Sequence, residues 1–515
     1  MTRHQTDAVT VSTHALRTSD VIAVARHGAH ITLSEDSITK VTTVRAHIDA
    51  LASSSTPVYG ISTGFGALAT EHIPVDKRTK LQQSLVRSHA AGIGPEVEKE
   101  VVRALMLLRL KTLASGHTGV RPETMTTLAA LLNAGITPIV HEFGSLGCSG
   151  DLAPLAHCAL VLMGEGRATG PDGIERPVPE LLSDAGITPI VLAEKEGLAL
   201  INGTDGMLGQ LILALEDLRT LVDIADVTAA LSVEALGGTD QVFLPELHLP
   251  LRPHLGQSVS ADRMLRTLAV SRIVNHNRNN EIRVQDAYSL RCAPQVSGSL
   301  RDTLTYATSV AERELAAAID NPVVLDDGRV LSNGNFHGAP IAHVLDFIAI
   351  PVADLASMAE RRTDRMLDVK RSHGLPPFLA NDPGTDSGLM IAQYTQAGIV
   401  SELKRLANPA SVDSIPSSAM QEDHVSMGWH GARKLRKAVE GLRRVLSIEL
   451  VAATRAIQLR APLEPGPVAR AIIEALPAQI EAPGPDSFMT PQLQAAEEML
   501  TDGTFTTIVA AALGD

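Results

Sequence analysis

Cysteine, aromatic residues and net positive charge are all scarce in this chain of 515 residues. Its three cysteines, Cys148, Cys158 and Cys292, are too few and too scattered for a disulfide framework, and none forms a CxxC pair. We therefore expect free thiols in a reducing compartment. The formal net charge of −14 argues against nucleic acid or an anionic membrane as partner, because both attract clustered Lys and Arg. Small molecules and proteins remain as expected partners.

Long unbroken apolar runs are also missing. Residues 1–20 lack the apolar stretch of a secretory signal, and the apolar segments further on are interrupted by charges, Gly or Pro. We expect a cytoplasmic protein with no membrane span. There is no repeat of fixed period, low-complexity tract or block of like charge.

Apolar residues at three-and-four spacing predict helices along most of the chain. Shorter predicted helices alternate with Gly-rich turns at 80–91, 98–115, 122–134 and 152–163, and longer ones follow at 207–236, 300–319, 337–371 and 428–458. The predicted fold class is mainly α. We expect a mixed N-terminal domain, residues 1–200, that carries the Gly-rich turns, and a long-helix bundle domain, residues 201–515, with short C-terminal capping helices.

The Gly-rich segment GSLGCSGD, residues 144–151, precedes a helix that Asp151 is placed to cap. It lacks the Lys-Ser/Thr of a phosphate-binding loop, the GxGxxG order of a dinucleotide-binding turn and a clear preceding strand, so a plain turn is a better reading than a nucleotide site. A third reading is chemical. In a tightly bent loop the unobstructed nitrogen of Gly150 attacks the carbonyl carbon of Cys148. Loss of water from this ring and from the Ser149 side chain leaves an electrophile, which no ordinary side chain provides.

Residues 144–157, GSLGCSGDLAPLAH, resemble the signature of the ammonia-lyase family that carries a methylidene-imidazolone (MIO) prosthetic group. The resemblance extends over most of the chain. It rests on YG at 59–60, SHAAG at 88–92, NGT at 202–204, VQD at 284–286, YSLRC at 288–292, GNFH at 334–337 and QEDHVSM at 421–427. This chain departs from the family at Cys148, where Ala is common, at Ala287, where Pro is common, and at Asp205, where an amide is common. None of these changes touches the ring chemistry.

The resemblance implies a helical architecture like that of fumarase and aspartase, and elimination of ammonia from an aromatic amino acid. It implies that an MIO group forms autocatalytically from Cys148, Ser149 and Gly150, with no exogenous cofactor, and that its electrophilic carbon derives from Ser149. Tyr59 is the expected base for the β-proton. Glu422 is the alternative base, and the sequence does not decide between them.

The resemblance also implies the remaining site residues and the assembly. Asn202, Gln285, Tyr288 and Phe336 are expected around the ring, with Tyr288 among the catalytic residues. Arg291 is expected to bind the substrate carboxylate through its guanidinium fork. The family's usual homotetramer, with residues of several subunits at each site, is the expected state.

The resemblance places His89 and Glu422 at the pocket for the substrate's side chain, and this pair indicates the substrate. A carboxylate accepts a hydrogen bond from an imidazole N–H, whereas beside a phenyl ring it would be desolvated without a partner. The expected reaction is therefore conversion of L-histidine to urocanate and ammonia. A tyrosine-specific lyase or aminomutase with the same electrophile remains an alternative, as does a catalytically silent homologue. Glu422-Asp423-His424 lacks HExxH spacing, so we expect no catalytic metal.

Overall fold

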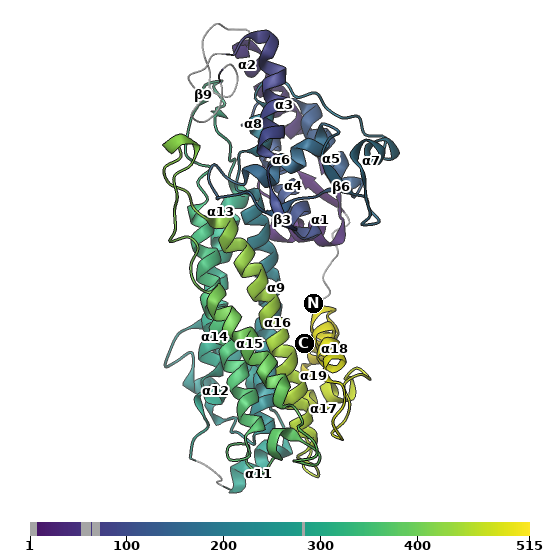
Figure 1. Cartoon of the computed structure of the whole chain (residues 1–515). Helices are drawn as coiled ribbons and strands as arrows, with labels where there is room; N and C mark the ends of the chain where they lie inside the picture. The colour runs from purple at the N-terminus through teal and green to yellow at the C-terminus, as the bar shows by residue number, and fades with distance from the viewer. Residues whose placement is uncertain (1–7, 53–62, 64–72, 281–283) are drawn as a thin grey trace.

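The computed structural model describes residues 8–52, 63, 73–280 and 284–515 of the chain. The molecule is elongated: the N-terminal part forms the upper end in Figure 1, and long helices run from it to the lower end. This arrangement confirms the prediction of a mainly helical fold in which a mixed region precedes a bundle of long helices. The domain boundary at residues 200 and 201 stays a prediction, and one cluster of buried apolar side chains continues across it.

The upper end consists of short helices and short strands. Its helices are α1 (Thr18–His27), α2 (Glu35–Ala52), α3 (Arg78–His89), α4 (Lys99–Ala114), α5 (Pro122–Asn133), α6 (Leu152–Leu162), α7 (Val178–Asp184) and α8 (Glu196–Ile201). Strands β1 (Ala8–Val11) and β2 (His30–Leu33) pair in parallel, whereas β3 (Ile93–Glu96) pairs antiparallel with β5 (His141–Phe143). An antiparallel sheet joins β4 (Thr137–Pro138), β6 (Arg167–Thr169) and β7 (Glu175–Pro177).

Strand β5 corrects one expectation, because it ends directly before Gly144 and the Gly-rich loop does follow a strand. The strand is only three residues long and its partner is antiparallel. A dinucleotide-binding turn needs a parallel βαβ unit. The nucleotide reading therefore gains no support from this strand.

The lower part is a bundle of long helices. It contains α9 (Asp205–Ala235), α10 (Leu255–Thr267), α11 (Arg272–Asn280), α12 (Tyr288–Arg291), α13 (Ala293–Ala316), α14 (Ala339–Leu367), α15 (Met390–Leu406) and α16 (Gly428–Gln458), with the hairpin of β8 (Val323–Val324) and β9 (Val330–Leu331) between α13 and α14. The capping helices α17 (Pro467–Glu474), α18 (Met489–Thr501) and α19 (Thr504–Leu513) lie beside it, near the chain's two ends in Figure 1.

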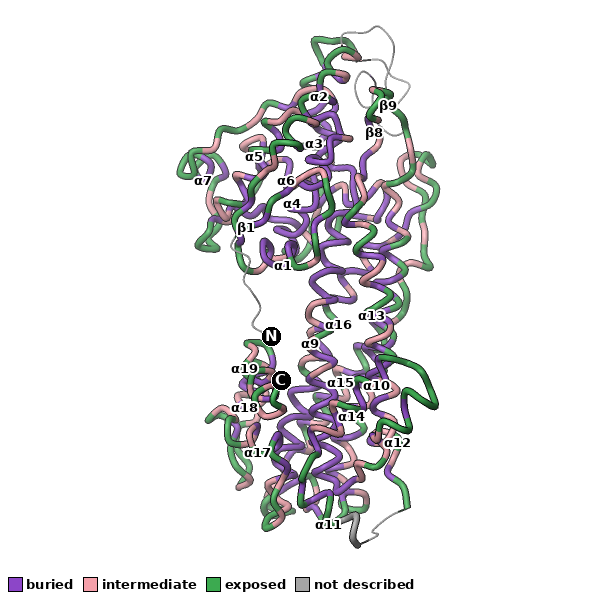
Figure 2. The backbone as a smooth tube through the Cα atoms, turned by 180° about the vertical axis from the view of Figure 1, so that it is seen from behind, coloured by how far each residue is buried: buried purple, intermediate pink, exposed green. Residues whose placement is uncertain are grey.

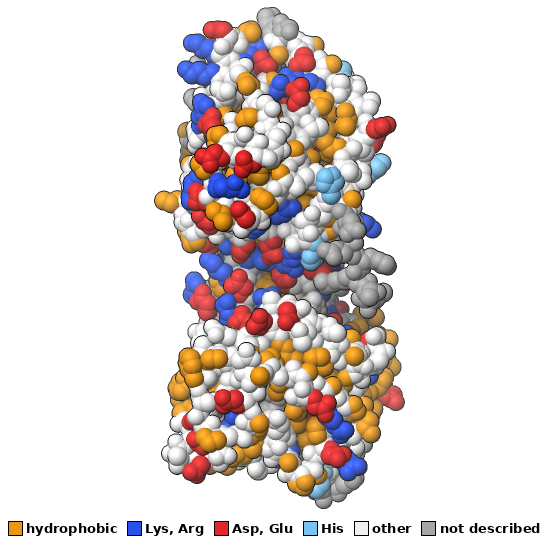
Figure 3. Space-filling view, turned by 90° about the vertical axis from the view of Figure 1, so that its right-hand side faces the viewer, with side chains coloured by type: hydrophobic (Ala, Val, Ile, Leu, Met, Phe, Trp, Pro, Cys, Tyr) orange, Lys and Arg blue, Asp and Glu red, His pale blue; other side chains and the backbone are white. Residues whose placement is uncertain are grey.

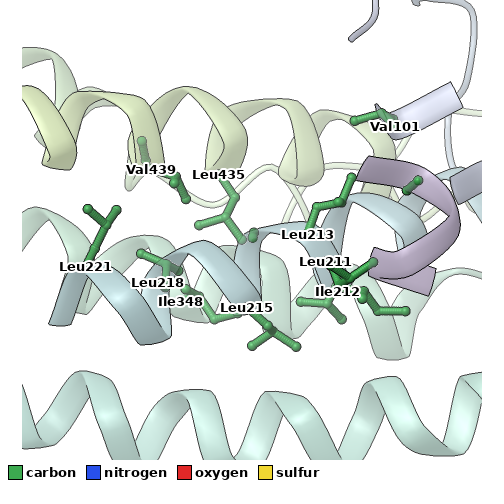
Figure 4. Close-up of a cluster of buried hydrophobic side chains, with 14 of the residues drawn as sticks. Val101, Leu211, Ile212, Leu213, Leu215, Leu218, Leu221, Ile348, Leu435 and Val439 are labelled. Carbon is green, nitrogen blue, oxygen red and sulfur yellow. The ribbon is translucent and has the colours of Figure 1, made fainter. Parts of the chain in front are cut away.

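Helix α9 forms the axis of the bundle. Nearly all of its residues are buried, and Figure 2 shows the burial running through the bundle. In Figure 4 its leucines lie near Leu435 and Val439 of α16, Ile348 of α14 and Val101 of α4. Full burial of one such side chain contributes about 1.5–3 kcal/mol. This packing fixes the upper part of the molecule to the first turns of α9.

Two helical stretches, 196–235 and 339–367, are long and apolar enough to cross a membrane by length and composition alone. In their most apolar windows, 100% and 67% of the residues are buried inside the protein. Burial of this kind is typical of core helices. Charged side chains instead gather at the waist between the two halves in Figure 3. Arg26 of α1 bonds to Glu100 of α4 (2.6 Å) and to Asp217 of α9 (2.8 Å), and the second of these ion pairs links the two halves.

Candidate active site

The Gly-rich loop lies where helices α6 and α9 begin, and Asp151 connects it to α9. The Asp151 carboxylate accepts hydrogen bonds from the amides of Gly206 and Met207 (both 2.9 Å) and from the Ser145 hydroxyl (2.8 Å). Its side chain does not cap α6, so the predicted cap is wrong: the carboxylate caps α9 instead. Burial raises the pKa of Asp151 to about 7, although these hydrogen bonds oppose the shift.

Two glycines of the loop pack against other segments without room for a side chain. Gly150 has a φ of +78°, and a Cβ there would overlap the backbone of Gly203. A Cβ on Gly147 would overlap the Ser426 hydroxyl, which donates to the carbonyl of Gly147 (2.9 Å). The amide of Gly338 donates to that same carbonyl (3.1 Å). Three segments distant in sequence therefore hold the loop in its bent form.

Asn202, at the end of α8, places a side-chain amide against the loop. Its Nδ2 donates to the carbonyl of Ser149 (3.3 Å), and its buried Oδ1 has no hydrogen-bond partner within the part of the chain that the structure describes. Burial raises the pKa of the Cys148 thiol, which keeps it protonated and poorly nucleophilic. Three features fit a group built from the backbone of residues 148–150. The backbone is bent at Gly150, the Cys148 thiol is protonated, and the buried side-chain amide of Asn202 bonds to the carbonyl of Ser149.

The segments that carry His89 and Glu422 both lie against this loop. Gly144 lies against Gly92, three residues after His89, which ends α3. The Nδ1 of His89 donates to the carbonyl of Leu85 (2.9 Å). Burial lowers the pKa of His89, whereas that hydrogen bond and the charge of Glu422 act in the opposite direction.

The segment that carries Glu422 is fixed by its own hydrogen bonds. The hydroxyl of Ser417 donates to Oε2 of Glu422 (2.8 Å), and the two backbones pair as an isolated bridge. The His424 ring stacks on the ring of His337 with centroids 5.2 Å apart. His337 directly follows Phe336 in the chain. This stacking connects the segment of Glu422 to the turn of Phe336, and the amide of Gly338 in the same turn bonds to the Gly-rich loop.

Three of the predicted site residues lie far from the Gly-rich loop in the fold: Gln285, Tyr288 and Arg291. Asp286, next to Gln285, accepts a hydrogen bond from the amide of Thr239 (2.8 Å), just after the end of α9. The loop adjoins the beginning of α9, and a helix of 31 residues is about 45 Å long at 1.5 Å per residue. Figure 1 likewise shows α12 near the lower end. One copy of the chain therefore does not bring these three residues to Ser149.

Tyr288 is 70% exposed, and the guanidinium carbon of Arg291 lies 4.6 Å from the centre of its ring. The Arg291 guanidinium thus lies against the ring of Tyr288, which is exposed on the surface of the bundle. Tyr59, the predicted base, lies outside the described residues. The described residues contain no group of three or more His, Cys, Asp or Glu side chains placed to hold a metal ion.

The sequence reading missed two residues near the loop, Ser426 and Arg109. Arg109 lies in the middle of α4, where Leu105, Leu108 and Leu110 are buried around it. Its signal was available in the sequence, because a charge flanked on both sides by apolar residues of a helix is a candidate for a buried and paired group. Ser426 lies within the QEDHVSM block at 421–427, but no local pattern singles out its hydroxyl.

Comparisons with known proteins agree on the family. The model of the aromatic amino acid lyase family matches residues 16–478. The histidine ammonia-lyase of Streptomyces avermitilis is 65% identical over 500 residues, covering 97% of this chain and 98% of that protein. The structure of histidine ammonia-lyase from Trypanosoma cruzi has a TM-score of 0.89 at 36% identity, covering 98% of this chain and 95% of that one. Tyrosine aminomutase from Streptomyces globisporus has a TM-score of 0.91 at 36% identity, covering 98% of both chains. The chain belongs to the aromatic amino acid lyase family.

Proposed function

We propose that the chain is a histidine ammonia-lyase, which eliminates ammonia from L-histidine without oxidation to give trans-urocanate, the first step of histidine degradation. The 65% identity to a histidine ammonia-lyase over nearly the whole chain supports this reaction. The observation that carries the choice of substrate is that His89, beside the Gly-rich loop, lies within the field of the Glu422 carboxylate. Tyrosine is the alternative substrate to be tested.

The hydrogen bonds of His89 suit an imidazole ligand. A carbonyl oxygen only accepts, so Nδ1 of His89 carries the proton that bonds to Leu85, and Nε2 is an acceptor. The lowered pKa keeps this imidazole neutral near pH 7. We propose that one substrate imidazole N–H donates to Nε2 of His89 and that Glu422 accepts from the other N–H when the substrate ring is protonated. A phenol offers only one O–H and cannot satisfy both residues.

We propose that Cys148, Ser149 and Gly150 form the MIO group, with no exogenous cofactor. When formed, this group supplies an electrophile for the substrate's amine and so makes ammonia a better leaving group. Asn202 holds the carbonyl of Ser149, and its unpartnered Oδ1 is available to accept a hydrogen bond from the substrate ammonium. The N-terminal ends of α6 and α9 place partial positive charge at the loop.

We propose Tyr59 as the base that removes the β-proton, with Glu422 as the alternative. Gln285 and Tyr288 contact the substrate, and the guanidinium of Arg291 binds its carboxylate with two parallel hydrogen bonds. These three residues reach the loop from another copy of the chain, because α9 separates them from it within one copy. Phe336 lines the same site from the turn before α14.

The proposed assembly is a homotetramer in the cytoplasm. Large apolar side chains that are about half exposed or more cluster on the bundle helices and the loop before α10; they are Leu251, Leu255, Val259, Tyr306, Phe347, Ile350, Ile391 and Tyr394. Such apolar surface is typical of subunit interfaces. A tetramer would cover it and bring α12 of one copy to the loop of another.

The test of this function begins with the intact mass of the purified protein. We expect the mass to be lower than the sequence mass by two waters, with the loss located in the peptide containing residues 148–150. Urocanate formation from histidine, followed by ultraviolet absorbance, is expected to be abolished in Ser149→Ala. Tyrosine is tested alongside histidine. An unreduced mass in active enzyme would contradict the MIO proposal, and faster turnover of tyrosine would overturn the choice of substrate.

A further inference from the structure

Arg109 of α4 is 1% exposed and binds four acceptors beneath the Gly-rich loop. Its Nη1 donates to the carbonyls of Ala199 (2.8 Å) and Asn202 (3.0 Å). Its Nη2 donates to the carboxylate of Asp205 (2.6 Å) and the carbonyl of Ile319 (3.2 Å). The guanidinium therefore joins the end of α8, the start of α9 and the segment that follows α13.

The guanidinium also supports Gly203, which lies between it and the loop. A Cβ on Gly203 would overlap Nη2 of Arg109, and a Cβ on Gly150 would overlap the backbone of Gly203. The carbonyl of Gly203 accepts a hydrogen bond from the amide of Asp151 (2.7 Å), directly after Gly150. Arg109, Gly203 and Gly150 thus form a continuous series of close contacts. Arg109 also connects to the loop through Asn202, whose Nδ2 donates to the carbonyl of Ser149 (3.3 Å).

A buried arginine is costly at this position. Taking an ion pair out of water costs several kcal/mol per ion, and an apolar residue of similar volume often stabilises a core as well or better. The planar fork of arginine offers five donors in fixed directions, which a lysine ammonium cannot reproduce. This geometry fits a requirement to hold several carbonyls at fixed positions, beyond what the packing of α4 needs.

We propose that Arg109 and Asp205 are positioning residues for closure of the ring from Cys148, Ser149 and Gly150. The inference rests on the proposed function, because it concerns formation of the proposed MIO group. Arg109 and Asp205 fix the Asn202–Gly203 turn, and this turn fixes Gly150 and the carbonyl of Ser149 in the bent form. Neither residue contacts the reacting atoms.

The chemistry that this geometry assists is a double dehydration. A bond forms between the nitrogen of Gly150 and the carbonyl carbon of Cys148. The carbonyl oxygen leaves as water with the amide hydrogens of Gly150 and Ser149. The second water takes the hydroxyl of Ser149 and its α-hydrogen. Nothing is oxidised or reduced, so ring closure needs no co-reactant. Its rate depends on how long the loop stays bent.

The test measures dehydration rather than turnover. Wild type, Arg109→Lys and Arg301→Lys are synthesised in a cell-free system, and the intact mass of the soluble protein is followed with time. Arg301 is the matched control, because it forms a largely buried ion pair with Asp226 (2.6 Å) within the bundle. We expect the dehydrated fraction of Arg109→Lys at early times to be at least tenfold lower than that of wild type. Arg301→Lys is expected to dehydrate like wild type.

Asp205 supplies a second pair of variants in case Arg109→Lys does not fold. In Asp205→Asn the amide oxygen still accepts from Nη2, so we expect ring closure at nearly the wild-type rate. In Asp205→Leu the only acceptor left to Nη2 among the described residues is the carbonyl of Ile319, and we expect the same delay as in Arg109→Lys. Circular dichroism and thermal melting report whether each variant is folded. A variant of a residue with a merely structural role would have a lower melting temperature, but its folded fraction would dehydrate at the wild-type rate.

The outcomes separate this inference from the proposed function. If wild type itself shows no loss of water, the MIO proposal fails. If wild type, Arg109→Lys and Asp205→Leu all dehydrate at the same rate, the MIO proposal stands and the positioning role is refuted. If Arg109→Lys does not fold, the Asp205 variants decide: equal dehydration rates for Asp205→Leu and Asp205→Asn also refute the positioning role.

Discussion

Replacing Glu422 by Gln tests the substrate pocket directly. Glutamine keeps the size of the side chain and an oxygen that accepts from Ser417, but it removes the charge that acts on His89. A hydrogen bond to a charged group contributes about 1.5–3 kcal/mol and a neutral one about 0.5–1.5 kcal/mol. We therefore expect to lose about 1–2 kcal/mol of transition-state binding. At about 1.4 kcal/mol per factor of ten, kcat/KM for histidine falls about 5- to 30-fold.

The assay compares initial rates for histidine and tyrosine with the same preparation of each variant. Tyrosine has no imidazole, so its kcat/KM is expected to change little or to rise in Glu422→Gln. Asp423→Asn is the matched control, because Asp423 is the exposed neighbour of Glu422 and its replacement removes the same charge. We expect that control to behave like wild type on both substrates.

Two results would refute this reasoning. An equal loss on both substrates of about a hundredfold or more is the size expected for removal of a general base, and it would assign the β-proton to Glu422 instead of Tyr59. Unchanged rates on both substrates would show that Glu422 contributes nothing to binding the ring. A loss confined to histidine supports the pocket as proposed.

The other predictions concern the assembly and the loop. Ser149→Ala and Arg291→Ala are each expected to be inactive, yet their co-expression restores activity, because one copy supplies an intact loop and another supplies Arg291; mixed tetramers without turnover would contradict this. Burial raises the pKa of Asp151 to about 7, above its usual value near 4, so the folded state holds this proton more tightly than the unfolded state. Its contribution to stability is present in acid and is lost as the pH rises from about 4 through 7. In Asp151→Asn, thermal melting is expected to show a flatter pH dependence across this window, and an unchanged slope would contradict the shift.

The long helices could be predicted because burial on one or more faces leaves a regular apolar spacing. Helix α16 begins and ends at the predicted residues, and α9 and α14 lie close to theirs. Helix α15 was missed because its pattern is irregular: Gln396 is buried, whereas Ile391 and Tyr394 are exposed. Apolar residues that are exposed in the fold are indistinguishable in the sequence from those that serve the core.

The loop could be predicted as a chemical unit, but its contacts could not. Asp151 directly precedes α6, and local capping rules place its carboxylate there. In the fold its partners are Gly206 and Met207, whose proximity arises only when α9 packs against the loop. Arg109 is likewise far in sequence from Asn202 and Asp205. Side-chain partners of this kind follow from tertiary packing, which no local pattern contains.

The backbone does not select the substrate in this family. A histidine ammonia-lyase and a tyrosine aminomutase are equally identical to this chain, at 36%, and match its fold with TM-scores of 0.89 and 0.91. The difference between their reactions must therefore lie in side chains. Here His89 lies at the end of α3, and Glu422 lies on a loop fixed by Ser417. Neither belongs to the Gly203–Gly150 contact that bends the loop. Substitutions at His89 and Glu422 should change which amino acid is deaminated while dehydration of residues 148–150 proceeds normally.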